Sequence, residues 1–136
     1  MMVMKNKSIV ACVIIGLCLT AGSDVFAQNE IFNPIKDVIK TGNAKEVSQY
    51  LNQSVDLSVD GNLNTYSKAQ AEFVLRDFFK KHPPTDFNIV HSGASKGGLQ
   101  YAICRYQSNS ESYNLMVRVK EVGGQNLIHE LTFQKE

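Results

Sequence analysis

Apolar positions early in the chain recur with the period of a helix. They follow Asn33-Pro34, a pair typical of a helix start because proline suits the first helical position. Gly42 predicts the end of this helix. Asn43 predicts the start of a second helix, with Glu46 at the capping-box position. The apolar faces of the two predicted helices comprise Ile35, Val38, Ile39, Val47, Tyr50 and Leu51.

A strict alternation of apolar and polar residues follows at residues 55–59, and this pattern is typical of a half-buried strand. Asp60-Gly61 is a strong signal for a two-residue hairpin turn, because both residues tolerate the positive φ angles that such a turn needs. Residues 62–66 are therefore expected to return as a short partner strand.

The helical period returns after Ser67, which has Gln70 three residues later and so predicts a capping box. Apolar residues then recur at helical spacing, and Phe73 and Phe79 widen the apolar face. A helix with so wide an apolar face is expected to be covered by other elements. Pro83-Pro84 predicts its end, because proline cannot continue the helical hydrogen bonds. The periodic positions are Ala71, Val74, Leu75 and Phe78.

Four apolar segments separated by turn residues occupy the rest of the chain. Their short links predict antiparallel pairing. The order of elements predicts an α+β fold, in which N-terminal helices and the long helix pack on a curved antiparallel sheet. Curling the sheet around the long helix would bury Phe73 and Phe78 inside a cone. The predicted strands cover residues 87–92, 99–106, 113–119 and 127–133.

The first 27 residues have the organisation of a secretory signal peptide. Lys5 and Lys7 form a basic start, an apolar run covers residues 9–19, and Val25-Phe26-Ala27 provides a cleavage motif. We expect cleavage after Ala27, export to the periplasm or the medium, and a single domain at residues 28–136. The apolar run is too short for a transmembrane anchor, which needs roughly 20 residues.

Cysteine use and charge follow from this processing. Cys12 and Cys18 lie in the leader, where their neighbours argue against a lipoprotein, and only Cys104 remains. No disulfide is therefore expected within the domain. Removing two lysines and one aspartate with the leader from 14 basic and 13 acidic residues leaves equal numbers of each. A neutral domain lacks the basic footprint of nucleic-acid-binding proteins, so we expect no nucleic-acid partner.

Several segments of the chain carry a resemblance to a known family. They are Thr41–Ala44, Tyr66–Glu72, Asp77–Pro84, Tyr101–Ile103 and Leu127–His129 with Leu131. With the element order, they resemble the cone of the nuclear transport factor 2-like (cystatin-like) superfamily. More narrowly, the chain resembles an uncharacterised family of exported Bacteroidota proteins, domain of unknown function 4783. The resemblance implies the cone fold and implies no activity. The chain departs from the family pattern at Asn114, where a basic residue is expected.

Two histidines are candidates for a binding pocket. The alternation of the predicted strands places His91 and His129 among apolar neighbours, so both are expected to point toward the cavity of the cone. There a histidine could serve as a general base or as a polar contact for a ligand. The alternative is a purely structural, hydrogen-bonded histidine at the rim of the core. This alternative is favoured because no carboxylate occurs at a spacing that indicates a catalytic pair. Tyr101, Tyr113 and Phe87 are further candidates for the pocket lining.

Other patterns point to no cofactor chemistry. The histidines and Cys104 have no compact metal-ligand spacing, so we expect neither a metal nor a cofactor. Gly93–Gly98 lacks the residue order of a phosphate-binding loop and is interpreted as a turn. His82 follows the long helix and is expected to be a solvated residue near the negative end of the helix dipole.

Three functions remain open on the sequence. The first is a non-enzymatic domain that binds an apolar or amphipathic small ligand or a protein partner. The second is a cone-fold enzyme of the isomerase or cyclase type that uses His91 or His129. The third is a structural homodimer formed through the outer face of the sheet, with Ala102, Cys104 and Met116 as candidate contacts.

Overall fold

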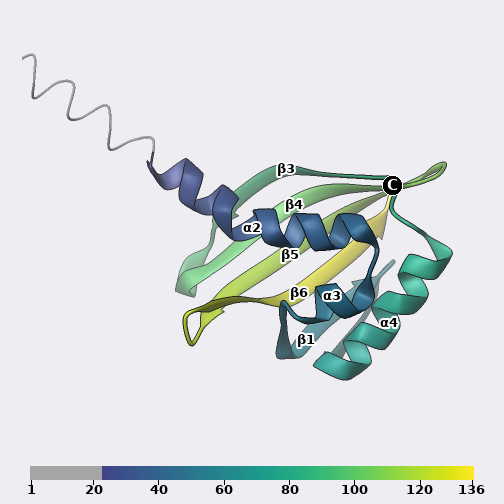
Figure 1. Cartoon of the computed structure of the whole chain (residues 1–136), viewed down its shortest axis with the longest axis horizontal. Coiled ribbons are helices and arrows are strands. Elements are labelled where there is room, and N and C mark those ends of the chain that lie inside the picture. The colour runs from purple at the N-terminus through teal and green to yellow at the C-terminus, as the bar shows by residue number, and fades with distance from the viewer. Residues whose placement is uncertain (1–22) are drawn as a thin grey trace, which may run out of the picture.

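The computed structural model describes residues 23–136, in which helices lie on one face of a six-stranded sheet (Figure 1). The predicted α+β class is confirmed. The predicted leader lies largely outside the described residues, and cleavage after Ala27 stays a prediction. In chain order the elements are α2 (Ser23–Thr41), α3 (Ala44–Ser48), β1 (Leu51–Val59), β2 (Asn62–Ser67), α4 (Lys68–Lys81), β3 (Asp86–Ala94), the single turn η1 (Lys96–Gly98), β4 (Leu99–Ser108), β5 (Glu111–Val122) and β6 (Gln125–Lys135).

The strands are ordered β2-β1-β6-β5-β4-β3 across the sheet. The four C-terminal strands form the expected antiparallel meander, with Val117 opposite both Ala102 on β4 and Leu131 on β6. β1 pairs with β2 across the Asp60-Gly61 turn, which confirms the predicted hairpin. β1 also runs parallel to β6, with Leu57 opposite Leu131. Local patterns could not predict this parallel pairing, because it joins segments far apart in the sequence.

Side chains from the helices and strands fill the concave side of the sheet. The inward positions of the central strands meet the apolar faces of α2 and α4 in one continuous core. Each large apolar side chain buried in this way contributes about 1.5–3 kcal/mol. The largest fully buried side chains are Phe32, Ile39, Leu51, Leu57, Leu75, Phe87, Tyr106, Tyr113, Leu115, Ile128, Leu131 and Phe133.

The long helix α4 begins and ends where the sequence predicts. Ser67 caps its start and forms the expected capping box with Gln70, since each side chain bonds the other residue's backbone N–H. The prediction that Phe73 is buried is wrong, because this side chain is 71% exposed. Successive helical residues are about 100° apart, so Phe73 lies nearly opposite Ala71 and Leu75, which face the sheet.

The two N-terminal helices differ from their predicted bounds. α2 begins before Asn33 and contains Pro34, so Asn33 does not cap it. Phe32 is buried in the core, and this packing stabilises the helical residues before Asn33. Local sequence signals do not reveal such a tertiary contact. α3 ends at Ser48, and Leu51 belongs to β1. None of the helices within residues 23–136 combines the length and apolar character needed to cross a membrane.

The start of α3 is capped differently from the prediction. The side chain of Asn43 accepts from the backbone N–H groups of Lys45 and Glu46, at 3.0 and 3.3 Å, as an N-cap should. The Glu46 carboxylate does not return to Asn43, as a capping box requires, but accepts from the Thr41 hydroxyl at 3.3 Å. The cap is therefore confirmed, and the capping box is wrong.

Candidate functional site

His91 lies on the outer face of the sheet, so the prediction that it points into the cone is wrong. The register between β3 and β4 passes from Ile89 opposite Cys104 to His91 opposite Ile103, which leaves Val90 as an extra residue. Such a bulge shifts the alternation of side chains by one position. His91 is exposed and lies beside Tyr101, with 3.3 Å between the imidazole Nε2 and the phenol oxygen.

The faces of β4 are also opposite to the prediction. Ala102 and Cys104 are buried in the core, so neither can contact a partner across the outer face of the sheet. Burial raises the pKa of the Cys104 thiol to about 12, which keeps it protonated and unreactive. Tyr101 consequently lies on the outer face, away from the core that Ala102 and Cys104 join. Met116 is half-buried, and a dimer through this outer face stays a prediction.

A second bulge changes the position of His129. β5 and β6 pair at Arg118 with Glu130 and at Val119 with Ile128, so His129 is the extra residue. Ile128 takes the buried position of this segment, and His129 is half-buried, with its Nδ1 3.1 Å from the backbone oxygen of Leu127. The fully buried position in this segment therefore belongs to Ile128, and the part predicted for His129 in a pocket stays a prediction.

Phe87 and Tyr113 do lie on the inner face, but the interior around them is filled. Phe87 is 1% exposed and packs edge-on against Tyr106. The hollow that Phe87 lines with Phe32 and Cys104 has about 10 Å³, which is at the lower limit for a single water molecule. The five predicted pocket residues thus do not converge on one cavity, and whether any of them binds a ligand stays a prediction.

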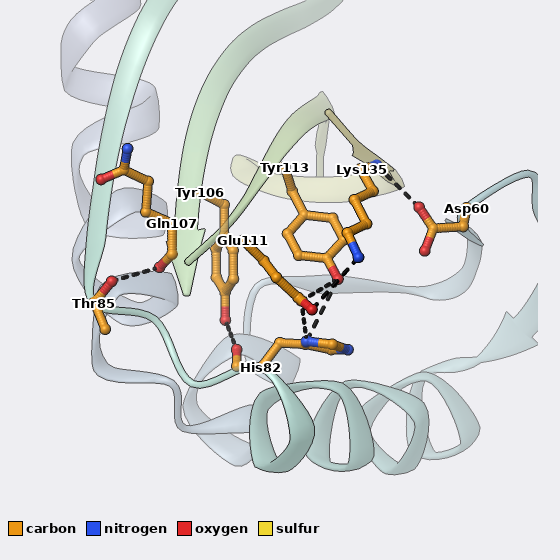
Figure 2. A network of polar contacts seen from close by, with 8 residues as sticks. All are labelled: Asp60, His82, Thr85, Tyr106, Gln107, Glu111, Tyr113 and Lys135. Carbon is orange, nitrogen blue, oxygen red and sulfur yellow. Dashed lines mark hydrogen bonds and ion pairs between the residues drawn. The ribbon is translucent and has the colours of Figure 1, made fainter. Parts of the chain in front are cut away.

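A cluster of polar residues lies instead where α4 ends beneath the β4–β5 hairpin (Figure 2). The Nδ1 atom of His82 is 2.8 Å from Oε2 of Glu111. The Tyr113 hydroxyl donates to the same oxygen at 3.1 Å, and Lys135 Nζ lies 3.5 Å from Oε1. His82 is thus not the solvated terminal residue that the sequence suggests, because its side chain is only 29% exposed.

Backbone contacts hold this polar cluster in place. The Tyr106 hydroxyl donates to the backbone oxygen of His82, which fixes the end of α4 against β4. Thr85 donates both its N–H and its hydroxyl to the backbone oxygen of Gln107. On the other side, Asp60 accepts from the backbone N–H of Lys135 at 2.9 Å. Four segments of the chain therefore meet at the cluster.

The charges of the cluster favour an ionised carboxylate next to protonated phenols. The hydrogen bond from Tyr113, aided by Lys135 and His82, lowers the pKa of Glu111 against an opposing effect of desolvation. Burial, together with the adjacent carboxylate, raises the pKa of Tyr113 to about 12. Burial likewise raises the pKa of Tyr106. Within residues 23–136, no three histidine, cysteine, aspartate or glutamate side chains converge as metal ligands.

Sequence reasoning missed His82 and Glu111 as partners. Nothing in their spacing predicts a contact, because the folding of the meander over the end of α4 brings them together. The only local signals are the proline pair that stops α4 at His82 and the tight turn at Asn109-Ser110 that starts β5.

The surface of the described residues has several open hollows, and two of them lie at opposite ends of the β5–β6 hairpin. The end groove, of about 400 Å³, lies beside the turn of this hairpin. The smaller His82 hollow, of about 270 Å³, lies by the polar cluster. The end groove is lined by Glu30, Ile31, Pro34, Gln49, Tyr50, Gln125, Asn126 and Leu127. The His82 hollow is lined by Val59, Val74, Asp77, Phe78, Lys81 and His82.

Replacing Glu111 with glutamine is expected to remove a pH-dependent contribution to stability. A carboxyl whose pKa is lowered by folding stabilises the protein above its ordinary value of 4.5, and this contribution is lost as the pH falls through the lower folded value. The difference in melting temperature between the unchanged protein and Glu111→Gln should therefore shrink between about pH 7 and about pH 3. Glu121→Gln, at an exposed position of the same strand, is the control. A constant difference would contradict the expectation.

Comparison with known proteins identifies the family. The chain belongs to the family described as Domain of unknown function (DUF4783), whose model matches residues 32–134. The resemblance found in the sequence is therefore confirmed. A comparison with curated proteins finds no match.

Solved structures share the cone fold. A DUF4783 family protein from Bacteroides ovatus is 24% identical with a TM-score of 0.68, and the match covers 78% of this chain and 92% of that one. A DUF4783 family protein from Bacteroides fragilis is 22% identical with a TM-score of 0.70, covering 75% and 95%. An ntf2-like protein of unknown function from Shewanella baltica is 12% identical with a TM-score of 0.60, covering 84% and 94%. The helices and curved sheet thus form a nuclear transport factor 2-like fold.

Proposed function

We propose that this protein is an exported, non-enzymatic domain that binds an amphipathic small ligand in the end groove. The observation that carries the proposal is the contrast between the two sides of the fold. The hollow that Phe32, Phe87 and Cys104 line inside the fold has only about 10 Å³, whereas the end groove offers about 400 Å³ open to solvent. His91 is exposed on the outer face and His129 is only half-buried, so neither is enclosed in the core, where the alternative enzyme would need one of them.

The lining of the end groove suits a ligand with an apolar body and a neutral or positively charged head. Ile31, Pro34, Tyr50 and Leu127 supply apolar walls, and the side-chain amides at the rim can donate and accept hydrogen bonds. Among the lining residues that the structure describes, Glu30 alone is charged. A carboxylate without a basic neighbour in the lining disfavours an anionic head.

The end groove is built from parts held together by the fold. α2 supplies one wall, the link between α3 and β1 supplies the second, and the start of β6 supplies the third. The backbone N–H of Ile128 donates to the backbone oxygen of Tyr50 at 2.7 Å, which fixes two of these walls to each other. Cleavage after Ala27 would leave the described lining residues, from Glu30 onward, in the exported chain.

The proposal is tested with N-phenyl-1-naphthylamine, a neutral amphipathic dye whose fluorescence rises in apolar surroundings. The full chain is expressed in a bacterium and recovered from the periplasm or medium, and its intact mass should correspond to a first residue of Gln28. The dye should bind saturably with one site. Failure to recover an exported chain would refute export, and absence of saturable binding would refute the ligand site.

Filling the end groove should abolish this binding. Asn126→Trp adds an indole at an exposed position of the groove and is expected to lower the dye affinity at least about tenfold, because the apolar walls are then covered. Asn64→Trp is the matched control, since Asn64 is an exposed strand residue on β2 that lines neither open hollow. Equal affinities for the two variants, measured by fluorescence titration, would place the dye elsewhere.

A further inference from the structure

The contact between His82 and Glu111 determines where the imidazole carries its proton. An ionised carboxylate can only accept hydrogen bonds, and Nδ1 of His82 lies 2.8 Å from one of its oxygens. Two acceptors at this distance would repel each other, so Nδ1 must hold a proton and donate it. The lowered pKa of Glu111 keeps this carboxyl ionised near neutral pH.

Tyr113 does not change this assignment. Its hydroxyl lies 3.4 Å from Nδ1 and 3.1 Å from the Glu111 oxygen, and its single proton is donated to the carboxylate. The ring of His82 is also held by packing, because its centre lies 5.1 Å from that of Phe78 and 5.5 Å from that of Tyr113. With Nδ1 protonated, a neutral imidazole has its lone pair on Nε2.

The free nitrogen of His82 is placed to meet a ligand. Figure 2 shows Nε2 on the side of the ring away from Glu111 and Tyr113. His82 also lines the His82 hollow, whose apolar walls are Val59, Val74 and Phe78. The charged residues of this hollow, Asp77 and Lys81, pair with each other at 3.0 Å. The hollow therefore combines apolar walls with two kinds of acceptor, Nε2 of His82 and the Asp77 carboxylate that Lys81 already pairs, and the ion pair adds no net charge.

We propose that the His82 hollow is a second ligand site, in which Nε2 of His82 accepts a hydrogen bond from the hydroxyl of a small, neutral phenol or alcohol. Glu111 is the positioning residue that holds the imidazole in the required tautomer, as carboxylates do for histidines elsewhere. The site goes beyond the proposed function, because it lies at the opposite end of the β5–β6 hairpin from the end groove. A ligand without a hydroxyl cannot donate this hydrogen bond, and Nε2 then accepts one from water instead.

The first test reads the tautomer directly. The protein labelled with ¹⁵N is studied by long-range ¹H–¹⁵N correlation of the histidine rings at about pH 8, where neutral imidazole is the common form. The Nδ1–H tautomer is expected for His82 in the unchanged protein, and loss of this preference is expected in Glu111→Gln, because an amide can donate as well as accept. A Nε2–H tautomer in the unchanged protein would overturn the proposal.

The second test compares phenol with toluene, which has a methyl group in place of the hydroxyl. Titration followed by the His82 ring signals should give an affinity for phenol about three- to tenfold higher than for toluene, which is the usual worth of one net hydrogen bond. Glu111→Gln should reduce this preference, whereas Glu121→Gln should retain it. Equal binding of phenol and toluene to the unchanged protein would overturn the proposal.

The two proposed sites can fail independently. Asn126→Trp, which fills the end groove, should leave phenol binding at His82 unchanged. Glu111→Gln should leave the binding of N-phenyl-1-naphthylamine unchanged, provided that its circular dichroism spectrum matches that of the unchanged protein. Loss of phenol binding in Asn126→Trp would place phenol in the end groove and refute the His82 site.

Discussion

Replacing Phe78 with alanine is expected to lower the free energy of unfolding by about 3–5 kcal/mol, the usual cost of truncating a buried phenylalanine. Phe78 is 5% exposed, and its ring contacts those of Tyr106, Tyr113 and Phe133, at centre distances of 5.6, 5.4 and 4.3 Å. It also supports the ring of His82. Because small domains are stable by only about 5–15 kcal/mol, urea denaturation should show a large fall in the midpoint.

Phe73→Ala on the same helix is the matched control. Phe73 is 71% exposed. The only interaction described for its ring is a cation–π contact with the guanidinium of Arg76, which lies 5.9 Å from the ring centre. Loss of this weak cation–π contact is offset by the better helix propensity of alanine. The free energy of unfolding should therefore change by no more than about 0.5 kcal/mol. Similar losses for the two variants would show that the face of α4 is assigned wrongly.

The Gly42→Ala variant is expected to lose about 2–4 kcal/mol of stability from two separate causes. Gly42 joins α2 to α3 with a φ of +69°, a left-handed conformation that costs a residue with a Cβ about 1–2 kcal/mol. An added Cβ would also lie 2.9 Å from Cδ of Pro84, which is closer than such atoms pack. A proline ring cannot rotate away, so the backbone must shift.

Gly61→Ala separates the two causes. Gly61 has a φ of +88°, but an added Cβ would meet no atom within 4 Å, so only the backbone cost of about 1–2 kcal/mol is expected. Pro84→Ala should in turn reduce the cost of Gly42→Ala, which a double-mutant cycle by chemical denaturation would measure. If Gly42→Ala and Gly61→Ala lower the free energy of unfolding equally, the contact with Pro84 adds nothing to the destabilisation of Gly42→Ala.

Most elements of the fold could be predicted from local patterns. Ser67 with Gln70 marks the start of α4, and Asp60-Gly61 marks the hairpin, because capping and positive φ are properties of a few neighbouring residues. The antiparallel meander follows from its short links. By contrast, the start of α2 depends on burial of Phe32, a contact that no local signal contains.

The faces of the strands were predicted less well than their positions. His91 and His129 were both assigned by simple alternation, and each lies at or just beyond a β-bulge. One extra residue reverses every later side chain, so alternation is reliable only between bulges. β4 has no such bulge, and its alternation is regular, but both of its faces carry apolar residues. The prediction took the face of Tyr101 as the inner one, whereas the structure buries the face of Cys104.

The sequence by itself determined the class of fold, because helical and strand periods, turn residues and caps are properties of short stretches of chain. The family was indicated by the resemblance of particular segments. Only the tertiary structure decided which histidine has a carboxylate partner. His82 and Glu111 meet because the meander folds back over the end of α4, where Phe78 and Tyr106 hold both elements in the core. Packing between distant segments sets that geometry, and no spacing along the chain encodes it.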